Sequence, residues 1–331
     1  MSVDFALIAE AARTLRPAIV ETPLVGSPGL DARVGARVLC KADNLQRTGS
    51  FKYRGACFRL SKLTAEERAR GVIAFSSGNF AQALAAAGAA AGVAVTIVMP
   101  VDAPSAKIDA TRGYGAEVVL SEHGARNREE AANELAMTLA EQRGLTKLHP
   151  FDDEFVVAGQ ASCGIEILRQ AAERGVTLDA LVVPVGGSGL IAGVALAVRT
   201  LSPATRVIGA EPEGFDDLRR SLDAGERRRI VPGARSICDA LQAATPGAVP
   251  FGAAHDAIAE SVGVTDDEAV AGMRAAFSDL KLVCEPSGAI ALGAVLAGLI
   301  SGAPRSIGVV LSGGNIAVDD YIRLLQKPPQ L

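Results

Sequence analysis

Alternating β-branched runs and helical stretches constrain the fold of this chain more than any other feature of its sequence. In residues 70–146, strand-like runs rich in Val and Ile are each followed by a turn and a helical pattern. Strands are expected at 72–75, 93–99 and 117–120, and helices at 81–91, 105–114 and 125–143. Strands that alternate with helices form parallel sheets with helices packed on their faces. We therefore predict an α/β fold.

The rest of the chain repeats this pattern and predicts another sheet. Strands are expected at 37–41, 181–185, 206–210 and 307–311, and helices at 4–15, 51–60, 156–174, 189–200, 266–280 and 287–301. The first group of strands and helices closes near His149 and Pro150. We therefore predict a large domain of residues 1–61 and 149–331, and a small domain of residues 70–146.

The composition supports a large core and argues against several partners. Of the 331 residues, 49% are hydrophobic and 21% charged, and the net charge is −4 without a basic stripe, so nucleic acid is not expected as a partner. Gly92 divides the apolar run 83–99 into helical and β-branched halves, which favours a helix and a strand over a membrane span. Five scattered cysteines and the lack of a signal-peptide pattern predict a cytoplasmic protein with reduced thiols.

One lysine has an unusual setting, in the stretch Thr-Gly-Ser-Phe-Lys-Tyr-Arg-Gly-Ala at residues 48–56. Lys52 follows small residues and stands between two aromatic residues, and Ser50 is expected to cap the helix that follows. A lysine in this position can act as a Schiff-base lysine for a carbonyl cofactor. The stretch alone also permits a surface lysine whose aliphatic stem lies along the protein.

A glycine-rich loop at residues 186–190 joins a predicted strand to a predicted helix. Glycines allow backbone N–H groups to approach an anion at a helix N-terminus, so the loop is a candidate phosphate site. Gly187, Gly189 and Ala192 also match the dinucleotide fingerprint, with Glu211 where a ribose-binding acid is expected. A nicotinamide-dependent dehydrogenase is therefore a competing hypothesis, and a turn without a ligand is another.

Three polar segments near the ends of predicted strands are weaker signals. Residues 76–79 and 312–315 suit contacts with a substrate carboxylate or a cofactor oxygen, although such turns are common. The acidic residues between 211 and 217 suit a hard cation, or else form a solvated loop. The sequence has no serine elbow and no Walker phosphate loop.

Together and in order, these segments resemble the fold-type II pyridoxal-phosphate (PLP) enzymes, in the branch of threonine and serine dehydratases and serine racemase. The matching stretches span nearly the whole chain, at residues 21–24, 41–56, 76–83, 107–112, 149–153, 158–160, 186–190, 285–288 and 312–315. The resemblance implies a two-lobed α/β fold with parallel-sheet cores, similar to the tryptophan synthase β subunit. It also implies PLP as cofactor, an amino acid as substrate and a homodimer.

The resemblance also implies a role for individual cofactor-binding residues. Lys52 would bind PLP covalently beside Phe51, and Asn79 would bond the 3-oxygen of the ring. Ser312 would face the pyridine nitrogen, and Glu285 would lie near the ring. The residues implied at the phosphate are Gly186, Gly187, Ser188, Gly189 and Leu190.

Substrate and metal positions follow from the same resemblance. Ser76, Ser77 and Gln82 would lie in the loop that meets the substrate, and Ser77 matches the second acid/base of the racemase branch. A cation, Mg²⁺ or Ca²⁺, would be bound by Glu211, the carbonyl of Phe215, and Asp217.

We therefore expect a dehydratase, or ammonia-lyase, that converts L-threonine or L-serine to a 2-oxo acid and ammonia. A neutral Ser312 does not keep the pyridine nitrogen protonated, which suits β-elimination more than transamination. At four positions this chain departs from the residues usual in the branch: Phe80, Glu154, Ser188 and Ala240. These departures extend the candidate substrates to 3-hydroxyaspartate or phenylserine. An amino-acid racemase is the alternative within the fold, and a non-catalytic binding module is a further alternative.

Overall fold

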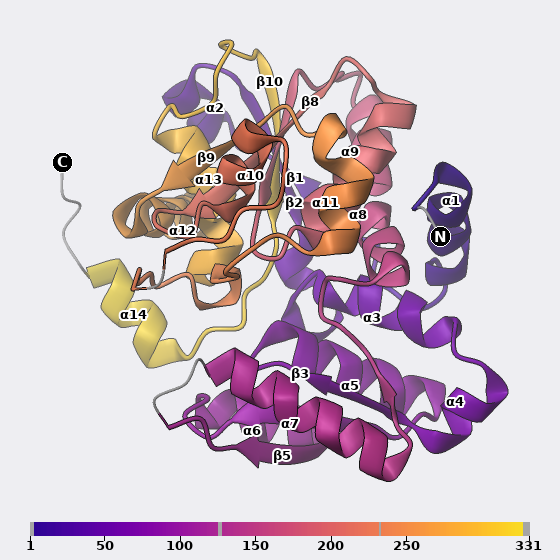
Figure 1. Cartoon of the computed structure of the whole chain (residues 1–331). Helices are drawn as coiled ribbons and strands as arrows, with labels where there is room; N and C mark the ends of the chain where they lie inside the picture. The colour runs from indigo at the N-terminus through magenta and orange to yellow at the C-terminus, as the bar shows by residue number, and fades with distance from the viewer. Residues whose placement is uncertain (1–2, 125–127, 232, 327–331) are drawn as a thin grey trace.

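The computed structural model describes residues 3–124, 128–231 and 233–326, and it contains two sheets (Figure 1). The six-stranded sheet has the order β1-β2-β10-β7-β8-β9, in which β1 is antiparallel to β2 and the other pairs are parallel. Its strands are β1 (Leu24–Val25), β2 (Arg37–Ala42), β7 (Ala180–Pro184), β8 (Arg206–Pro212), β9 (Glu260–Val264) and β10 (Ser306–Leu311). This arrangement confirms the predicted α/β class.

The second sheet is four-stranded and fully parallel, with the order β5-β4-β3-β6. Its strands are β3 (Val72–Phe75), β4 (Val95–Pro100), β5 (Glu117–Ser121) and β6 (Thr146–Lys147). All four come from residues 72–147, whereas the six-stranded sheet uses segments on both sides of that range. The predicted domain boundaries remain a proposal, which this distribution of strands supports.

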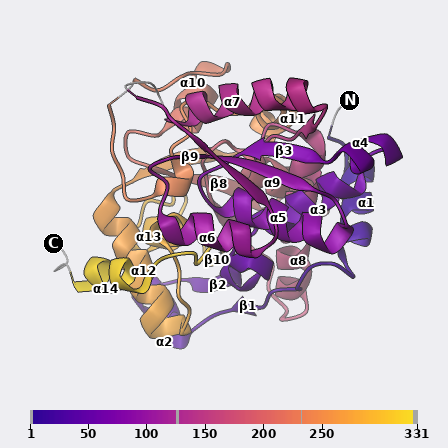
Figure 2. The same ribbon diagram turned by 90° about the horizontal axis from the view of Figure 1, so that it is seen from below.

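Helices cover both faces of each sheet, because successive strand side chains point to opposite faces. In β7, Leu181 and Val183 pack with α8 and α9, whereas Val182 packs with α12 and α13. In the smaller sheet α5 and α7 lie on opposite faces (Figure 2). The helices are α1 (Phe5–Leu15), α2 (Pro28–Val34), α3 (Lys52–Ser61), α4 (Ala65–Arg70), α5 (Asn79–Ala91), α6 (Ser105–Gly113), α7 (Arg128–Arg143), α8 (Glu154–Ala172), α9 (Gly189–Leu201), α10 (Asp217–Ala224), α11 (Ala248–Ala254), α12 (Asp266–Leu280), α13 (Pro286–Leu296) and α14 (Val318–Gln326).

Two predicted helix ends are wrong. Ser50 does not cap α3: its extended backbone forms a bridge with Gly313, its Oγ has no hydrogen-bond partner, and Phe51 precedes the helix without a side-chain cap. The helix predicted at 287–301 ends at Leu296, since Gly298 adopts a left-handed φ of 71° that stops it. The start predicted for the helix at 125–143 lies outside the described residues.

The apolar run at 83–99 divides as predicted, between α5 and β4. Within the described part of the chain, no helix combines the length and apolar character needed to cross a membrane.

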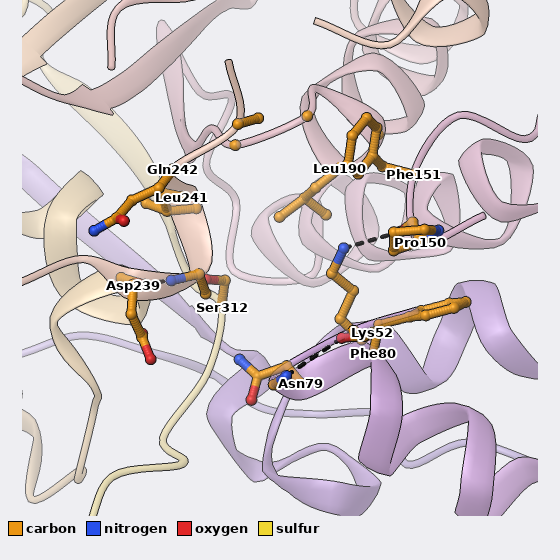
Figure 3. A pocket seen from close by; sticks show the side chains of 18 of the residues that line it. Lys52, Asn79, Phe80, Pro150, Phe151, Leu190, Asp239, Leu241, Gln242 and Ser312 are labelled. Carbon is orange, nitrogen blue, oxygen red and sulfur yellow. Dashed lines mark hydrogen bonds between the residues drawn. The ribbon is translucent and has the colours of Figure 1, made fainter. Parts of the chain in front are cut away.

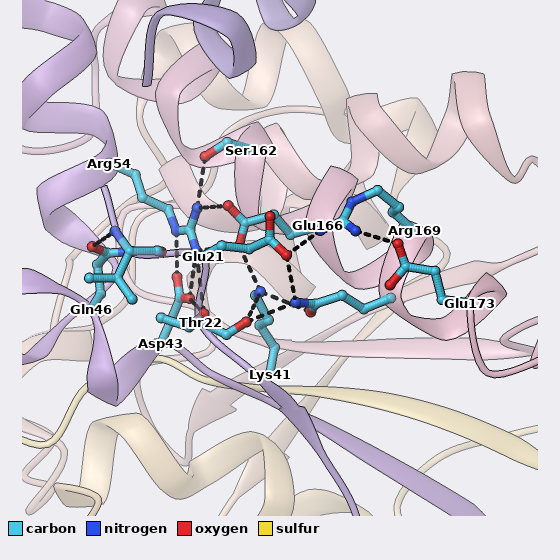
Figure 4. A network of polar contacts seen from close by, with 12 residues as sticks. Glu21, Thr22, Lys41, Asp43, Gln46, Arg54, Ser162, Glu166, Arg169 and Glu173 are labelled. Carbon is cyan, nitrogen blue, oxygen red and sulfur yellow. Dashed lines mark hydrogen bonds and ion pairs between the residues drawn. The ribbon is translucent and has the colours of Figure 1, made fainter. Parts of the chain in front are cut away.

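A network of buried charges ties α3 to its neighbours (Figure 4). The guanidinium of Arg54 is fully buried and donates to both carboxylate oxygens of Asp43, each at 2.8 Å, and to Glu166 at 2.6 and 2.8 Å. The buried amine of Lys41 lies 2.6 Å from Glu166. Two cations and two carboxylates thus balance one another beneath the helix that begins at Lys52.

Candidate active site

A cavity lies where the carboxyl ends of β3, β7 and β10 meet, and its wall joins segments far apart in the sequence. Side chains from the loops and helices that connect the strands of both sheets point into this cavity (Figure 3). Of the residues predicted at the site, those that line it are Phe51, Lys52, Ser76, Ser77, Asn79, Gly186, Gly187, Ser188, Gly189, Leu190, Glu285 and Ser312. Ligands bind outside the carboxyl ends of parallel strands, so this position suits a ligand site.

Lys52 is the first residue of α3, and its side chain extends into the cavity. Its amine donates a hydrogen bond to the carbonyl oxygen of Pro150, 2.9 Å away. The same nitrogen lies 5.2 Å from the ring centre of Phe51 and 5.8 Å from that of Phe80. Lys52 is therefore an oriented amine beside aromatic rings, and not the surface lysine of the alternative hypothesis.

Asn79 begins α5 and is held on two sides. Its amide nitrogen donates to Glu285 at 2.6 Å, and its oxygen accepts from Asn315 at 2.8 Å. Burial raises the pKa of Glu285 to about 7, and the charge of Asp239 contributes to the rise. The other carboxyl oxygen of Glu285 is buried and accepts no hydrogen bond from any residue that the structure describes.

The glycine loop joins β7 to α9, as predicted, and lies against Phe151. A Cβ atom at Gly187 would lie 2.3 Å from the Phe151 ring, so only glycine fits there. Ser188 adopts a left-handed conformation at the start of α9. Ser312 is buried after β10, and its carbonyl accepts the backbone N–H of Phe51 at 3.0 Å, which joins the lysine stretch to the last strand.

Gln82 does not line this cavity. It lies on α5 in the wall of a second cavity, between α5 and α6 on one side and α14 on the other. This second cavity adjoins the first, because Lys107, Asp239 and Glu285 line both. The contact of Gln82 with the substrate stays a prediction.

The predicted metal ligands gather away from the cavity, at the end of β8. The buried carboxylate of Glu211 accepts from the backbone N–H groups of Leu218 and Arg219 and from the Ser261 hydroxyl, at 2.7 to 2.9 Å. Both carboxyl oxygens of Asp217 are buried and make no hydrogen bond to the part of the chain that the structure describes. Burial together with Glu211 raises the pKa of Asp217 to about 8. Phe215 is buried in the loop between them. An orphaned carboxylate beside a second carboxylate is a donor set that fits a hard cation.

The same geometry argues against the nicotinamide hypothesis. Glu211 does not line the cavity around the glycine loop, and its carboxylate already accepts three hydrogen bonds. It therefore does not occupy the position of a ribose-binding acid.

Several residues at the cavity had no role assigned from the sequence. Lys107 of α6 forms an ion pair with Asp239 across the cavity mouth. Burial alone would lower the pKa of Lys107, but Asp239 and Glu285 outweigh it and raise that pKa. Pro150 and Phe151 line the wall beside Lys52. The matching stretches 107–112 and 149–153 contain Lys107, Pro150 and Phe151 and are the sequence signal for these three residues, whereas Asp239 lies in no matching stretch.

The groups that line the cavity fit PLP. The cavity combines a lysine amine, a glycine loop at a helix N-terminus, and two buried polar atoms without partners, Ser188 Oγ and one carboxyl oxygen of Glu285. An aldehyde can react with the amine, and a helix N-terminus favours a phosphate.

Comparison with known proteins agrees with this geometry. The family model described as "Pyridoxal-phosphate dependent enzyme" matches residues 15–313. An L-threo-3-hydroxyaspartate ammonia-lyase of Pseudomonas sp is 39% identical over 96% of this chain and 97% of its own length. A serine racemase of Arabidopsis thaliana is 37% identical over 95% of this chain and 94% of its own.

A solved structure agrees as well. The crystal structure of a threonine deaminase from T.th. superposes with a TM-score of 0.88 and 40% identity, and the match covers 95% of this chain and 99% of that one. The chain therefore belongs to the family of pyridoxal-phosphate-dependent enzymes, with PLP as its cofactor.

Proposed function

We propose that this enzyme is an ammonia-lyase that converts a β-hydroxy amino acid to a 2-oxo acid and ammonia. The observation that carries the proposal is the Lys52 amine, held at Pro150 in the cavity that also contains the glycine loop and Ser312. Relatives named L-threo-3-hydroxyaspartate ammonia-lyase and L-threonine ammonia-lyase support it.

PLP supplies an electron sink for the negative charge left on the substrate's α-carbon. Lys52 would bind PLP and move the α-proton, with Phe51 beside the ring. Asn79 and Ser312 would orient the ring, and Glu285 would lie close to it. Residues 186–190 would hold the phosphate at the N-terminus of α9. Ser76 and Ser77, in the loop after β3, would meet the substrate.

We propose L-threo-3-hydroxyaspartate as the first substrate to test, before L-serine, L-threonine and phenylserine. Lys107 lines the cavity, and its ammonium group has three N–H donors, so it can bind a second carboxylate on the substrate in addition to Asp239. We expect K107M to raise KM for hydroxyaspartate about tenfold, the effect of losing one hydrogen bond to a charged group, and to change KM for L-serine little. Equal effects on both substrates would refute this role of Lys107.

A single assay tests the reaction type. The purified holoenzyme is incubated with each amino acid, with and without Mg²⁺, and the 2-oxo acid and the D-amino acid are measured in the same sample. We expect pyruvate from L-serine. Formation of D-serine without pyruvate would refute the lyase and support an amino-acid racemase, the second candidate, for which Ser77 and relatives named serine racemase are the arguments.

We also propose a homodimer in the cytoplasm. Phe277 of α12 and Ile322 of α14 are half exposed on contacting helices, a surface that a second copy of the chain would cover. F277E should then convert the dimer to a monomer, as measured by light scattering.

The five cysteines support the proposed cytoplasmic location. All five are free thiols, as expected in a reducing compartment.

A further inference from the structure

Ser188 adopts a backbone conformation that is unfavourable for serine. Its φ of 70° and ψ of 1° lie in the left-handed region, where a Cβ atom crowds the backbone and glycine is preferred. At the neighbouring position 187, glycine is required for steric reasons, because a Cβ atom there would overlap the Phe151 ring. Position 188 thus combines a glycine-like backbone with a side chain. Strained residues of this kind gather at functional sites.

The Ser188 hydroxyl makes no hydrogen bond to the described residues that would offset this strain. The residue is 3% exposed, and within the described ranges its Oγ is without a hydrogen-bond partner. Ser188 precedes α9, yet its side chain does not cap that helix. Since buried hydroxyl groups are normally paired, an unpaired one on a cavity wall indicates a partner that belongs to a ligand.

The surroundings of Ser188 indicate an anionic partner. α9 is 13 residues long, and its first N–H groups and its dipole favour a negative charge at Ser188. A hydroxyl can donate to a phosphate oxygen, and such a bond to a charged group is stronger than one between neutral groups.

We propose that the Ser188 hydroxyl donates a hydrogen bond to the PLP phosphate. This bond offsets the backbone strain of Ser188 in the holoenzyme, whereas in the apoprotein the strain has no compensation. The inference rests on the proposed position of the phosphate at residues 186–190. It makes Ser188 a residue that strengthens cofactor binding and weakens the apoprotein. Removing the whole side chain, as in S188G, must then weaken cofactor binding and stabilise the apoprotein.

The test uses apoprotein of the wild type, S188G and S188A, with two probes in calorimetry. Pyridoxine 5′-phosphate has no aldehyde to react with Lys52, and pyridoxine also lacks the phosphate. We expect both variants to bind pyridoxine 5′-phosphate about tenfold more weakly, as for the loss of one hydrogen bond to a charged group. Their affinity for pyridoxine should not change. The melting temperature of apo S188G should rise by about 2 °C, because glycine relieves the strain.

A matched control separates strain from phosphate binding. Lys281 also has a left-handed φ, of 61°, at the exposed end of α12 and outside the cavity. K281G should raise the melting temperature similarly and leave the affinity for pyridoxine 5′-phosphate unchanged.

Three results would overturn the inference. Variants that bind pyridoxine 5′-phosphate as tightly as the wild type would show that the hydroxyl has no role at the phosphate. An equal loss of affinity for pyridoxine would indicate that the substitutions distort the loop. If the melting temperature of apo S188G were not higher than that of the wild type, the proposed backbone strain at Ser188 would be contradicted. A wild-type protein that binds no pyridoxine 5′-phosphate would instead contradict the proposed phosphate site itself.

Discussion

The side-chain amine of Lys52 donates a hydrogen bond to the main-chain oxygen of Pro150, 98 residues further along the chain. The next residue, Phe151, packs against the place where a side chain at Gly187 would lie. One short segment, residues 149–153, therefore contacts both the amine and the glycine loop. This segment therefore positions the Lys52 amine relative to the glycine loop, the two parts of the protein that would bind the aldehyde and the phosphate of PLP.

Replacing Lys52 tests its role directly. K52A should lower turnover at least about a thousandfold, the scale of a lost acid/base group, and should abolish covalent attachment of the cofactor after borohydride reduction. K62A is the matched control, because Lys62 directly follows the same helix and pairs with the half-exposed Glu10. Borohydride attachment that persists in K52A would exclude Lys52 as the lysine that binds PLP.

Replacing Ser77 separates elimination from racemisation. If Ser77 moves a proton on the face of the substrate away from Lys52, S77A should reduce D-serine formation about a hundredfold and leave most pyruvate formation. Both products are measured in one reaction by chiral chromatography and a coupled assay. A parallel loss of both would mean that Ser77 binds the substrate instead.

Replacing Arg54 should destabilise the protein strongly. R54M leaves the buried carboxylate of Asp43 without its ion-pair partner and leaves Glu166 with Lys41 alone, which costs about 3–5 kcal/mol. Urea unfolding measures the change. The control is R169M, whose partners Glu21 and Glu173 lie in solvent, and which should cost at most about 1 kcal/mol. Similar losses in both variants would contradict this account of the buried network.

His149 should make stability depend on pH in mildly acidic solution. Burial lowers the pKa of His149 to about 4, from 6.5 in the unfolded chain. Between these values the unfolded chain binds the proton more tightly, so stability is fully present above pH 6.5 and falls toward pH 4, by about 3 kcal/mol in total.

The variant H149N tests this slope. The Nδ1 atom of His149 accepts the backbone N–H of Asp152 at 2.9 Å, and an asparagine oxygen can take its place without titrating. Unfolding free energies at several pH values should therefore show a flatter curve for H149N. A slope equal to that of the wild type would assign the titration to another group.

A divalent cation should stabilise the protein through Asp217. We expect Mg²⁺ at a hundredfold excess over its Kd to add about 2.7 kcal/mol to the wild type and almost nothing to D217N. Thermal unfolding with Mg²⁺, Ca²⁺ and a chelator measures this. Asp216 is the matched control, because its carboxylate is already paired with Arg219 and Arg220, and D216N should keep the response. The cation site would be refuted if D217N responded like the wild type.

The sequence by itself determined the elements and the kind of site. Short apolar runs such as Val72–Phe75 and the glycine-rich residues 186–189 are local patterns, so strands, helices and the glycine loop could be predicted from them. The order of the motifs pointed to the family, and hence to Lys52, Asn79 and Ser312 around one cavity.

Only the tertiary structure decided which side chains meet. Asn79 and Glu285 are 206 residues apart and share a 2.6 Å hydrogen bond, while Gln82, three residues after Asn79, faces another cavity. Ser50 pairs with Gly313 instead of capping its own helix. Local propensity carries no information about such contacts, because they depend on how segments far apart in the sequence pack together. The cavity, and the unpaired Ser188 hydroxyl within it, exist only after that packing.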